Sequence, residues 1–191
     1  MVYLYKMPGM IKSICLEVKH MKKEVITLEN ITYKNYVKVL FGLKVNRKQQ
    51  EFVASNMCSL AEAYVALTNG YTPYPFAICR NGKPIGFLMI GSGFPEEEME
   101  EGDPDFIVDN YCIWRLMIDK RYQGRGYGRK AMELALEFIR TWPSGKMKYF
   151  WLSYEPENES AKELYASFGF VEQPQFFSGK PGEEMPALLE L

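Results

Sequence analysis

The sequence predicts one α/β domain built on a mixed β-sheet that is flanked by helices. Three observations predict this class. Apolar residues make up 47% and aromatic residues 15% of a 191-residue chain, which is enough to close a single core. Strand-like and helix-like patterns follow one another in the order βααβββαβαββ. No repeat or internal linker divides the chain, so we expect one domain.

The N-terminal part of this pattern contains one strand and two helices. Residues 25–30 predict an edge strand. Thr32 is expected to cap a short helix. Asn46 is expected to cap a longer one, whose apolar face continues to about Leu67 before a glycine and two prolines end it.

A hairpin and the remaining elements follow. Asn81-Gly82 is a preferred turn dipeptide, so residues 75–80 and 83–90 are predicted to pair as antiparallel strands. The rest of the chain is predicted to form a strand at 111–118, a helix to about residue 140, a strand at 148–154, a helix at 161–168 and strands starting near 170 and 185.

Composition excludes several classes of protein. The formal net charge is −1, so a nucleic-acid partner held by bulk basicity is not indicated. No apolar run approaches the roughly 18–20 residues that span a bilayer. One histidine, His20, cannot form a histidine triad or metal cluster, and four widely spaced cysteines without a signal peptide are typical of reduced thiols. We therefore expect a cytoplasmic protein with no metal site and no nucleic-acid or membrane partner.

Two segments differ from the rest of the chain. Residues 1–20 are interpreted as an N-terminal extension or disordered tail, because Met21 looks like a natural start, and the domain is assigned to residues 21–191. Residues 94–105 are rich in Glu and Asp and contain no Lys, Arg or His. This acidic segment is either a solvated loop or a source of negative field beside a site for a cationic substrate.

Residues 111–140 give the strongest functional signal. The apolar strand 111–118 is followed by a basic, glycine-rich turn and then by an amphipathic helix. The first turn of a helix has unpaired N–H groups and partial positive charge, and glycines let a ligand approach the backbone. Arginines at 121, 125 and 129 add charge. The arrangement predicts a site for phosphate, and more specifically for a pyrophosphate.

Two common phosphate motifs are absent from this turn. Gly124-Arg125-Gly126 is followed by Tyr127-Gly128-Arg129, so arginine stands where the dinucleotide fingerprint needs its third glycine. No Gly-Lys-Ser/Thr ends the turn, which excludes a P-loop. The residues from Gln123 to Gly128 instead have the form Q/R-x-x-G-x-G/A.

That form resembles the acetyl-coenzyme A pyrophosphate loop of the GNAT N-acetyltransferases. A second motif similar to that family follows in the expected order, Asn158-x-x-Ala161-x-x-Leu164-Tyr165-x-x-x-Gly169-Phe170. The order of elements from Met21 onward is also similar. The resemblance implies a mostly antiparallel sheet that splays between its two central strands, with about four flanking helices. It also implies acetyl transfer from acetyl-coenzyme A to a primary amine.

The resemblance assigns coenzyme-binding roles to individual residues. The pantetheine arm would pair with the backbone near Leu116, Met117 and Ile118, and the Met117 N–H would polarise the thioester carbonyl as a catalytic donor. The pyrophosphate would bind the turn after Gln123. Asn158 would lie near the coenzyme arm, cap the following helix, or do both. The expected turn residues are Gln123, Gly124, Arg125, Gly126, Tyr127, Gly128 and Arg129.

The resemblance also suggests an acid but leaves the base open. Tyr165 matches the family tyrosine whose phenol protonates the departing thiolate, although a purely packing role is the alternative. In the resemblance, some polyamine-acetylating relatives carry a carboxylate on the central strand nine residues before the Q/R of the loop, where this chain has Trp114. Asp109, Glu155 or a water chain are then candidates for the base. Trp114 and Tyr111 are expected to contact the substrate.

The acceptor is the least determined part. The loop looks most like that of bacterial spermine/spermidine acetyltransferases, so a small cationic amine, and a polyamine in particular, is the favoured acceptor. Aminoglycosides and protein or peptide amines remain alternatives. A non-catalytic acyl-coenzyme A sensor would need the loop but not Tyr165. Edge strands at both ends of the sheet make a homodimer a further expectation.

Overall fold

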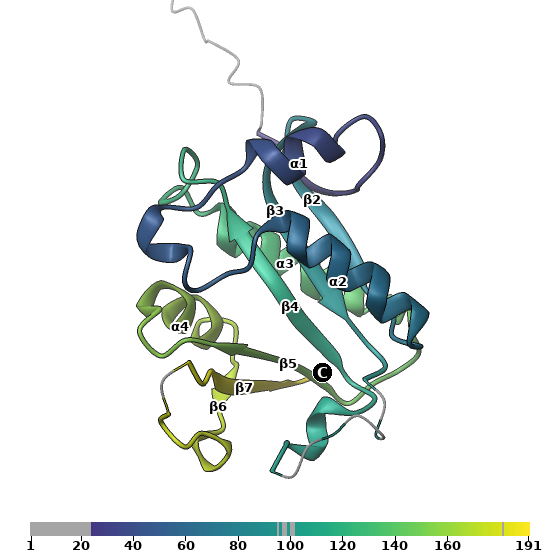
Figure 1. Ribbon diagram of the computed structural model, residues 1–191, viewed down its shortest axis with the longest axis vertical. Coiled ribbons are helices and arrows are strands. Elements are labelled where there is room, and N and C mark those ends of the chain that lie inside the picture. Colours follow the sequence, from purple (N-terminus) through teal and green to yellow (C-terminus); the bar gives the residue numbers. More distant parts are fainter. Residues whose placement is uncertain (1–23, 95, 97–98, 100–101, 181) are drawn as a thin grey trace, which may run out of the picture.

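The structure is a computed structural model that describes residues 24–94, 96, 99, 102–180 and 182–191 (Figure 1). The expected extension at 1–20 lies outside the described residues, as does part of the acidic segment 94–105. No helix in the described part is long and apolar enough to cross a membrane.

Seven strands form one sheet in the order β1-β2-β3-β4-β5-β7-β6. They are β1 (Ile26–Asn30), β2 (Tyr74–Arg80), β3 (Lys83–Gly91), β4 (Tyr111–Ile118), β5 (Tyr149–Tyr154), β6 (Val171–Glu172) and β7 (Met185–Glu190). All neighbouring strands run antiparallel except β4 and β5, which are parallel. The sheet is therefore mixed and mostly antiparallel, as predicted.

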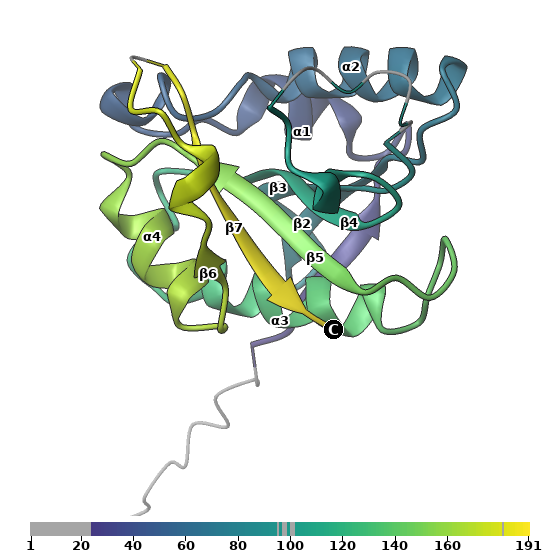
Figure 2. The same ribbon diagram turned by 90° about the horizontal axis from the view of Figure 1, so that it is seen from below.

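Helices cover both faces of the sheet (Figure 2). α1 and α2 lie on one face, and α3 and α4 lie on the other. The two faces have separate cores: Met132 and Ile139 of α3 belong to the larger, and Val39 of α1 belongs to the smaller. In the described residues the helices are α1 (Tyr36–Gly42), α2 (Asn56–Thr68), α3 (Tyr127–Ile139) and α4 (Glu159–Ala166), with 3-10 turns η1 (Arg47–Gln49), η3 (Asp105–Ile107) and η4 (Pro174–Phe176).

The predicted hairpin is confirmed. Asn81 and Gly82 both have positive φ, +49° and +74°, as a type I′ turn requires. β2 and β3 pair on either side of this turn with one bulge. The predicted bounds of the central strand, 111–118, are those of β4.

The prediction of one long helix from Asn46 to Leu67 is wrong. Asn46 heads only η1, where it and Gln49 form a reciprocal capping box. α2 begins ten residues later, and Ser55 caps it by accepting from the Cys58 N–H at 3.2 Å. The first helix also begins later than predicted, because Asn35 rather than Thr32 occupies the N-cap position of α1.

Candidate active site

β4 and β5 separate after three residue pairs. Residues 111–113 pair with 150–152, and no later residue of β4 pairs with β5. The backbone of residues 114–118 therefore faces a wedge-shaped opening on the β5 side, the splay that the resemblance implied. An extended ligand can enter this opening and use the free backbone groups as an added strand would.

A β-bulge at Trp114 changes which residues face each side of the sheet. Met89 pairs with Arg115 and Ile90 with Ile113, so Trp114 has no partner on β3. Ile113 packs in the α3 core before the bulge, and Leu116 packs against the same core after it. Trp114 instead packs on the α1–α2 side.

The strand register argues against the Met117 N–H as an oxyanion donor. The Asp119 N–H donates to the Ile85 carbonyl at 2.8 Å, and alternate residues of an antiparallel strand point their N–H groups to the same neighbour. The Met117 N–H therefore points toward β3. The backbone of Leu116 and Ile118 points toward the opening, consistent with the hydrogen bond that the Ile118 carbonyl accepts from Gln123. Of the predicted backbone donors, the Leu116 N–H and not the Met117 N–H therefore faces the opening.

A cavity of about 1090 Å³ occupies the opening and continues beneath α2. It is large enough for a ligand of coenzyme size together with part of an acceptor. The predicted site residues that line it are Trp114, Leu116, Met117, Ile118, Gln123, Gly124, Gly126, Tyr127, Gly128, Asn158 and Tyr165. Most of the predicted site is thus brought to one surface.

The glycine turn adopts a conformation that requires glycine at two positions. Gly124 and Gly126 have φ values of +72° and +78°, and Gly126 is the N-cap of α3. A Cβ at either position would meet no atom within 4 Å, so the constraint is backbone conformation rather than space. The open surface over these glycines and the first turn of α3 suit a pyrophosphate.

Two polar side chains hold the turn in place. Gln123 donates to the Ile118 carbonyl at 2.8 Å and to Gln49 Oε1 at 3.0 Å, so it joins the turn to both β4 and η1. Asp119, 1% exposed, accepts from the Lys44 and Arg121 N–H groups and from the Arg121 guanidinium at 2.7–3.0 Å. Burial opposes ionisation of Asp119, but Arg121 and these N–H groups outweigh it and lower its pKa.

Three side chains of the turn make their main contacts outside the cavity. The Tyr127 hydroxyl donates to Glu24 at 2.7 Å, and its ring is buried. Arg129 donates to Ser167 at 2.8 Å and stacks on Phe168. Arg125 lies over the Tyr122 ring and is not among the lining residues. Of these three, only Tyr127 reaches the cavity.

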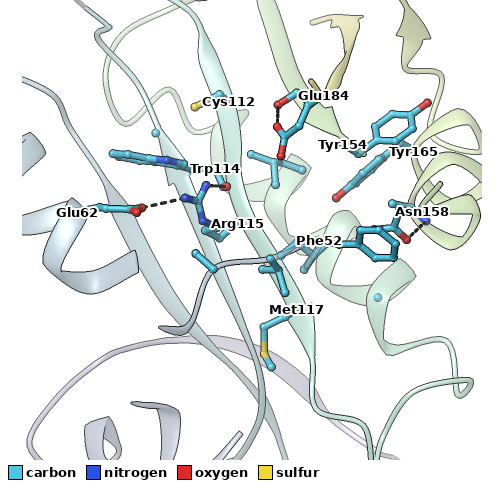
Figure 3. A pocket seen from close by; sticks show the side chains of 18 of the residues that line it. Phe52, Glu62, Cys112, Trp114, Arg115, Met117, Tyr154, Asn158, Tyr165 and Glu184 are labelled. Atoms are coloured by element: carbon cyan, nitrogen blue, oxygen red, sulfur yellow. Dashed lines mark hydrogen bonds and ion pairs between the residues drawn. The ribbon is translucent and has the colours of Figure 1, made fainter. Parts of the chain in front are cut away.

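Asn158 and Tyr165 meet at the α4 side of the cavity. Asn158 is the N-cap of α4 and accepts from the Ala161 N–H at 3.3 Å, so the predicted cap is confirmed. The Tyr165 hydroxyl points into the cavity, whereas that of the neighbouring Tyr154 points away (Figure 3). Burial, and then the negative charge of Glu184, raise the pKa of the Tyr165 phenol, so it stays protonated across the physiological range.

The structure contradicts the prediction that Tyr111 contacts the substrate. Its side chain is fully buried on the α3 face of the sheet. Its hydroxyl donates to the Gly145 carbonyl at 2.9 Å and accepts from the Ser144 N–H at 3.0 Å. Trp114, on the opposite face, does line the cavity.

The cavity is also lined by charged residues that sequence reasoning missed. Glu51, Glu62 and Glu184 line it, together with Arg115, which forms an ion pair with Glu62 at 2.9 Å. No local motif marks these carboxylates, because they come from three separate elements. Asp109 and Glu155, the bases considered from sequence, are not among the lining residues.

Comparisons with known proteins agree with this geometry. The model of the acetyltransferase (GNAT) family matches residues 46–170, more than half of the chain. The chain is 29% identical over 147 residues to the spermine/spermidine N(1)-acetyltransferase of Bacillus subtilis (strain 168), covering 76% of this chain and 87% of that protein.

Solved structures share the fold at lower identity. The aminoglycoside acetyltransferase AAC(6')-Ib in complex with coenzyme A has a TM-score of 0.61 at 21% identity, covering 87% of this chain and 95% of that one. The spermidine N-acetyltransferase from Vibrio cholerae in complex with coenzyme A and spermine has a TM-score of 0.58 at 19% identity, covering 86% and 95%. With its splayed strands, glycine turn and family match, the chain belongs to the GNAT family and is an N-acetyltransferase.

Proposed function

We propose that this enzyme transfers the acetyl group of acetyl-coenzyme A to a primary amine of a polyamine such as spermine or spermidine, by direct attack in a ternary complex. The observation that carries the proposal is the charge of the cavity wall. Among the described residues, three carboxylates and one guanidinium line it. Since Glu62 already pairs with Arg115, Glu51 and Glu184 remain to attract ammonium groups.

The described ends of the acidic segment lie at the cavity. Phe94 and Ile107, near its two ends, both line the cavity, and Phe94 forms a bridge with Val108. A cationic acceptor in the cavity would therefore lie close to both ends of this segment. The name of the Bacillus relative and the spermine bound in the Vibrio structure support the same acceptor class.

Residues on both sides of the opening have roles in the proposed reaction. The glycine turn and the first turn of α3 bind the pyrophosphate, and the backbone of Leu116 and Ile118 pairs with the pantetheine arm. The Leu116 N–H polarises the thioester carbonyl. Tyr165 gives its proton to the departing thiolate. The acceptor amine approaches from the α2 side of the cavity.

The proposal is tested by measuring thiol release from acetyl-coenzyme A with spermine, spermidine, kanamycin and a peptide amine. We expect the polyamines to give the highest kcat/KM. Acetylation of kanamycin or peptide alone would replace the acceptor class, and calorimetric binding of acetyl-coenzyme A without turnover of any amine would favour a sensor.

A matched pair of variants tests the wall charge. Glu51→Gln should raise the KM for spermine several-fold at low salt and leave the KM for acetyl-coenzyme A unchanged. Glu157→Gln, an exposed carboxylate outside the cavity lining, is the control. Equal KM values for spermine in both variants would contradict the electrostatic argument.

A further inference from the structure

We propose that Glu184 is the carboxylate that accepts the proton of the acceptor ammonium, so that Glu184 and Tyr165 act as the base and acid of the transfer. The inference rests on the proposed function for the acceptor being an amine that is protonated at neutral pH. Glu184 would supply the base that β4 lacks, since Trp114 stands at the position where a carboxylate was expected.

Glu184 lies where the attacking amine must be. It directly precedes β7, and Met185 pairs with Tyr154 on β5. Because of this pairing, Glu184 lies on the β5 side of the opening, opposite β4. The Glu184 carboxylate accepts a hydrogen bond from the Ser153 hydroxyl. Figure 3 shows the carboxylate on the cavity wall between Trp114 and Arg115 on one side and Tyr165 on the other.

Glu184 also acts electrostatically on its neighbours. Burial, and then the Glu184 charge, raise the pKa of the Tyr165 phenol and the pKa of the Glu155 carboxyl. Tyr165 must lie near the thioester sulfur to protonate it. Because Figure 3 shows the Glu184 carboxylate beside Tyr165, Glu184 would also lie near the carbon that the amine attacks.

The other carboxylates are less suitable. Glu62 is engaged by Arg115 at 2.9 Å and by the Cys58 thiol at 3.4 Å, so taking a proton would break an ion pair. Glu51 belongs to the segment between η1 and α2 and not to the strands that form the opening. Glu155 and Asp109 do not line the cavity. Glu184 alone among these combines a hydroxyl anchor with proximity to Tyr165.

The protons and electron pairs balance over the reaction. An N–H bond of the ammonium breaks, and its proton passes to the Glu184 carboxylate. The amine then forms a C–N bond with the thioester carbon, the C–S bond breaks with its electron pair on sulfur, and Tyr165 protonates that sulfur. The second nitrogen proton, released as the amide forms, restores the phenol. Because Glu184 is solvent-exposed, it returns its proton to water.

The magnitude of the first step shows why the cavity is needed. An alkylammonium of pKa about 10.4 and a carboxylate of about 4.3 differ by roughly 6 pKa units in water. The cavity would hold the ammonium and the Glu184 carboxylate in contact, so that the proton passes directly between them. Attack on the thioester also consumes the neutral amine as it forms.

The experiment compares Glu184→Gln with wild type by pH profiles of kcat/KM, using whichever amine the wild type acetylates best. Glu157→Gln is the matched surface control. At pH 7 we expect Glu184→Gln to lose about 10²–10³-fold in kcat/KM. As pH rises toward the pKa of the amine, the loss in kcat/KM should shrink about tenfold per pH unit, because a growing fraction of the amine in solution is already deprotonated.

A second acceptor makes the test specific. A fluorinated primary amine has a pKa far below that of spermidine, so it binds in its neutral form. With this amine, kcat/KM should fall less than tenfold in Glu184→Gln. Ser153→Ala, which removes only the anchor, should shift the profile in the same direction by a smaller factor. Binding of acetyl-coenzyme A, followed by calorimetry, should be unchanged in both variants.

Several outcomes would overturn the assignment. One is an equal fall in kcat/KM with both amines in Glu184→Gln. Another is a higher KM in that variant with an unchanged kcat and pH profile, which would make Glu184 only a charge that binds the acceptor. If the wild type acetylates no polyamine but does acetylate another amine, the proposed acceptor class fails while the role of Glu184 is still tested on that amine.

Discussion

Replacing Asp119 by Asn should destabilise the protein through the turn that binds the pyrophosphate. Each carboxylate oxygen of Asp119 accepts two donors, one a backbone N–H and one a nitrogen of Arg121. The Asn amide keeps one acceptor oxygen but turns an NH₂ group toward the other two donors. The side chain is 1% exposed, so water cannot replace the lost acceptor.

The size of the effect follows from these contacts. Two hydrogen bonds to a charged acceptor are worth about 1.5–3 kcal/mol each. The Arg121 side chain is 51% exposed and can turn to water, so its share is discounted and the total becomes about 2–3 kcal/mol. For a domain of this size, that loss lowers Tm by roughly 4–12 °C.

The sign of the pH dependence gives a second test. The folded-state pKa of Asp119 is lowered, so its stabilisation is present above the unfolded pKa and is lost as pH falls through the folded pKa. The Tm difference between wild type and Asp119→Asn, measured by circular dichroism, should therefore be full at pH 7 and shrink below about pH 4. Glu157→Gln controls for the loss of one negative charge. An equal Tm at pH 7, or a difference that persists unchanged at pH 3, would refute the reasoning.

Three further predictions concern the α4 side and the outer helices. Tyr165→Phe should lower kcat by about 10²-fold without changing the Kd for coenzyme A, because the ring packing against Tyr154 and Phe170 is kept; equal kcat would remove Tyr165 as the acid. Asn158→Ala should cost about 1 kcal/mol of stability and Asn158→Ser little; if both raise the KM for acetyl-coenzyme A, Asn158 also contacts the coenzyme, and if neither does, it is only a cap. The expected homodimer should use the exposed apolar residues of α1 and α2, so Phe41→Glu with Tyr64→Glu should convert a dimer to a monomer in light scattering; a wild-type monomer would contradict this.

The local patterns predicted the elements whose structure is decided locally. Asn81-Gly82 determines its hairpin through two positive φ values, and the apolar run at 111–118 matches β4. The two motifs placed Gln123 and Tyr165 on one cavity although 42 positions separate them (165 − 123). The predictions of the hairpin and of β4 succeed because turn geometry and strand burial depend on neighbouring residues.

The failures all depend on tertiary context. The helix predicted from Asn46 ends after one turn, and the Gln49 side chain there accepts hydrogen bonds from the Asn46 N–H and from the distant Gln123. Met117 was assigned from the family resemblance and Tyr111 as a substrate contact, but the direction of a strand residue depends on its register with β3. One bulge at Trp114 changes the alternation, and no residue pattern in the sequence marks that bulge.

The base was not found on β4 because Trp114 occupies the position where the family resemblance suggested a carboxylate. Trp114 and Arg115, the residues at the bulge, lie on the α2 side, one as an aromatic wall and the other as the ion-pair partner of Glu62. A wedge between two strands has two walls, however, and an acceptor amine in the proposed ternary complex could contact either wall. On the opposite wall, the pairing of β5 with β7 brings Ser153 and Glu184 to the cavity. A carboxylate missing from one strand of a splayed pair should therefore be sought across the opening.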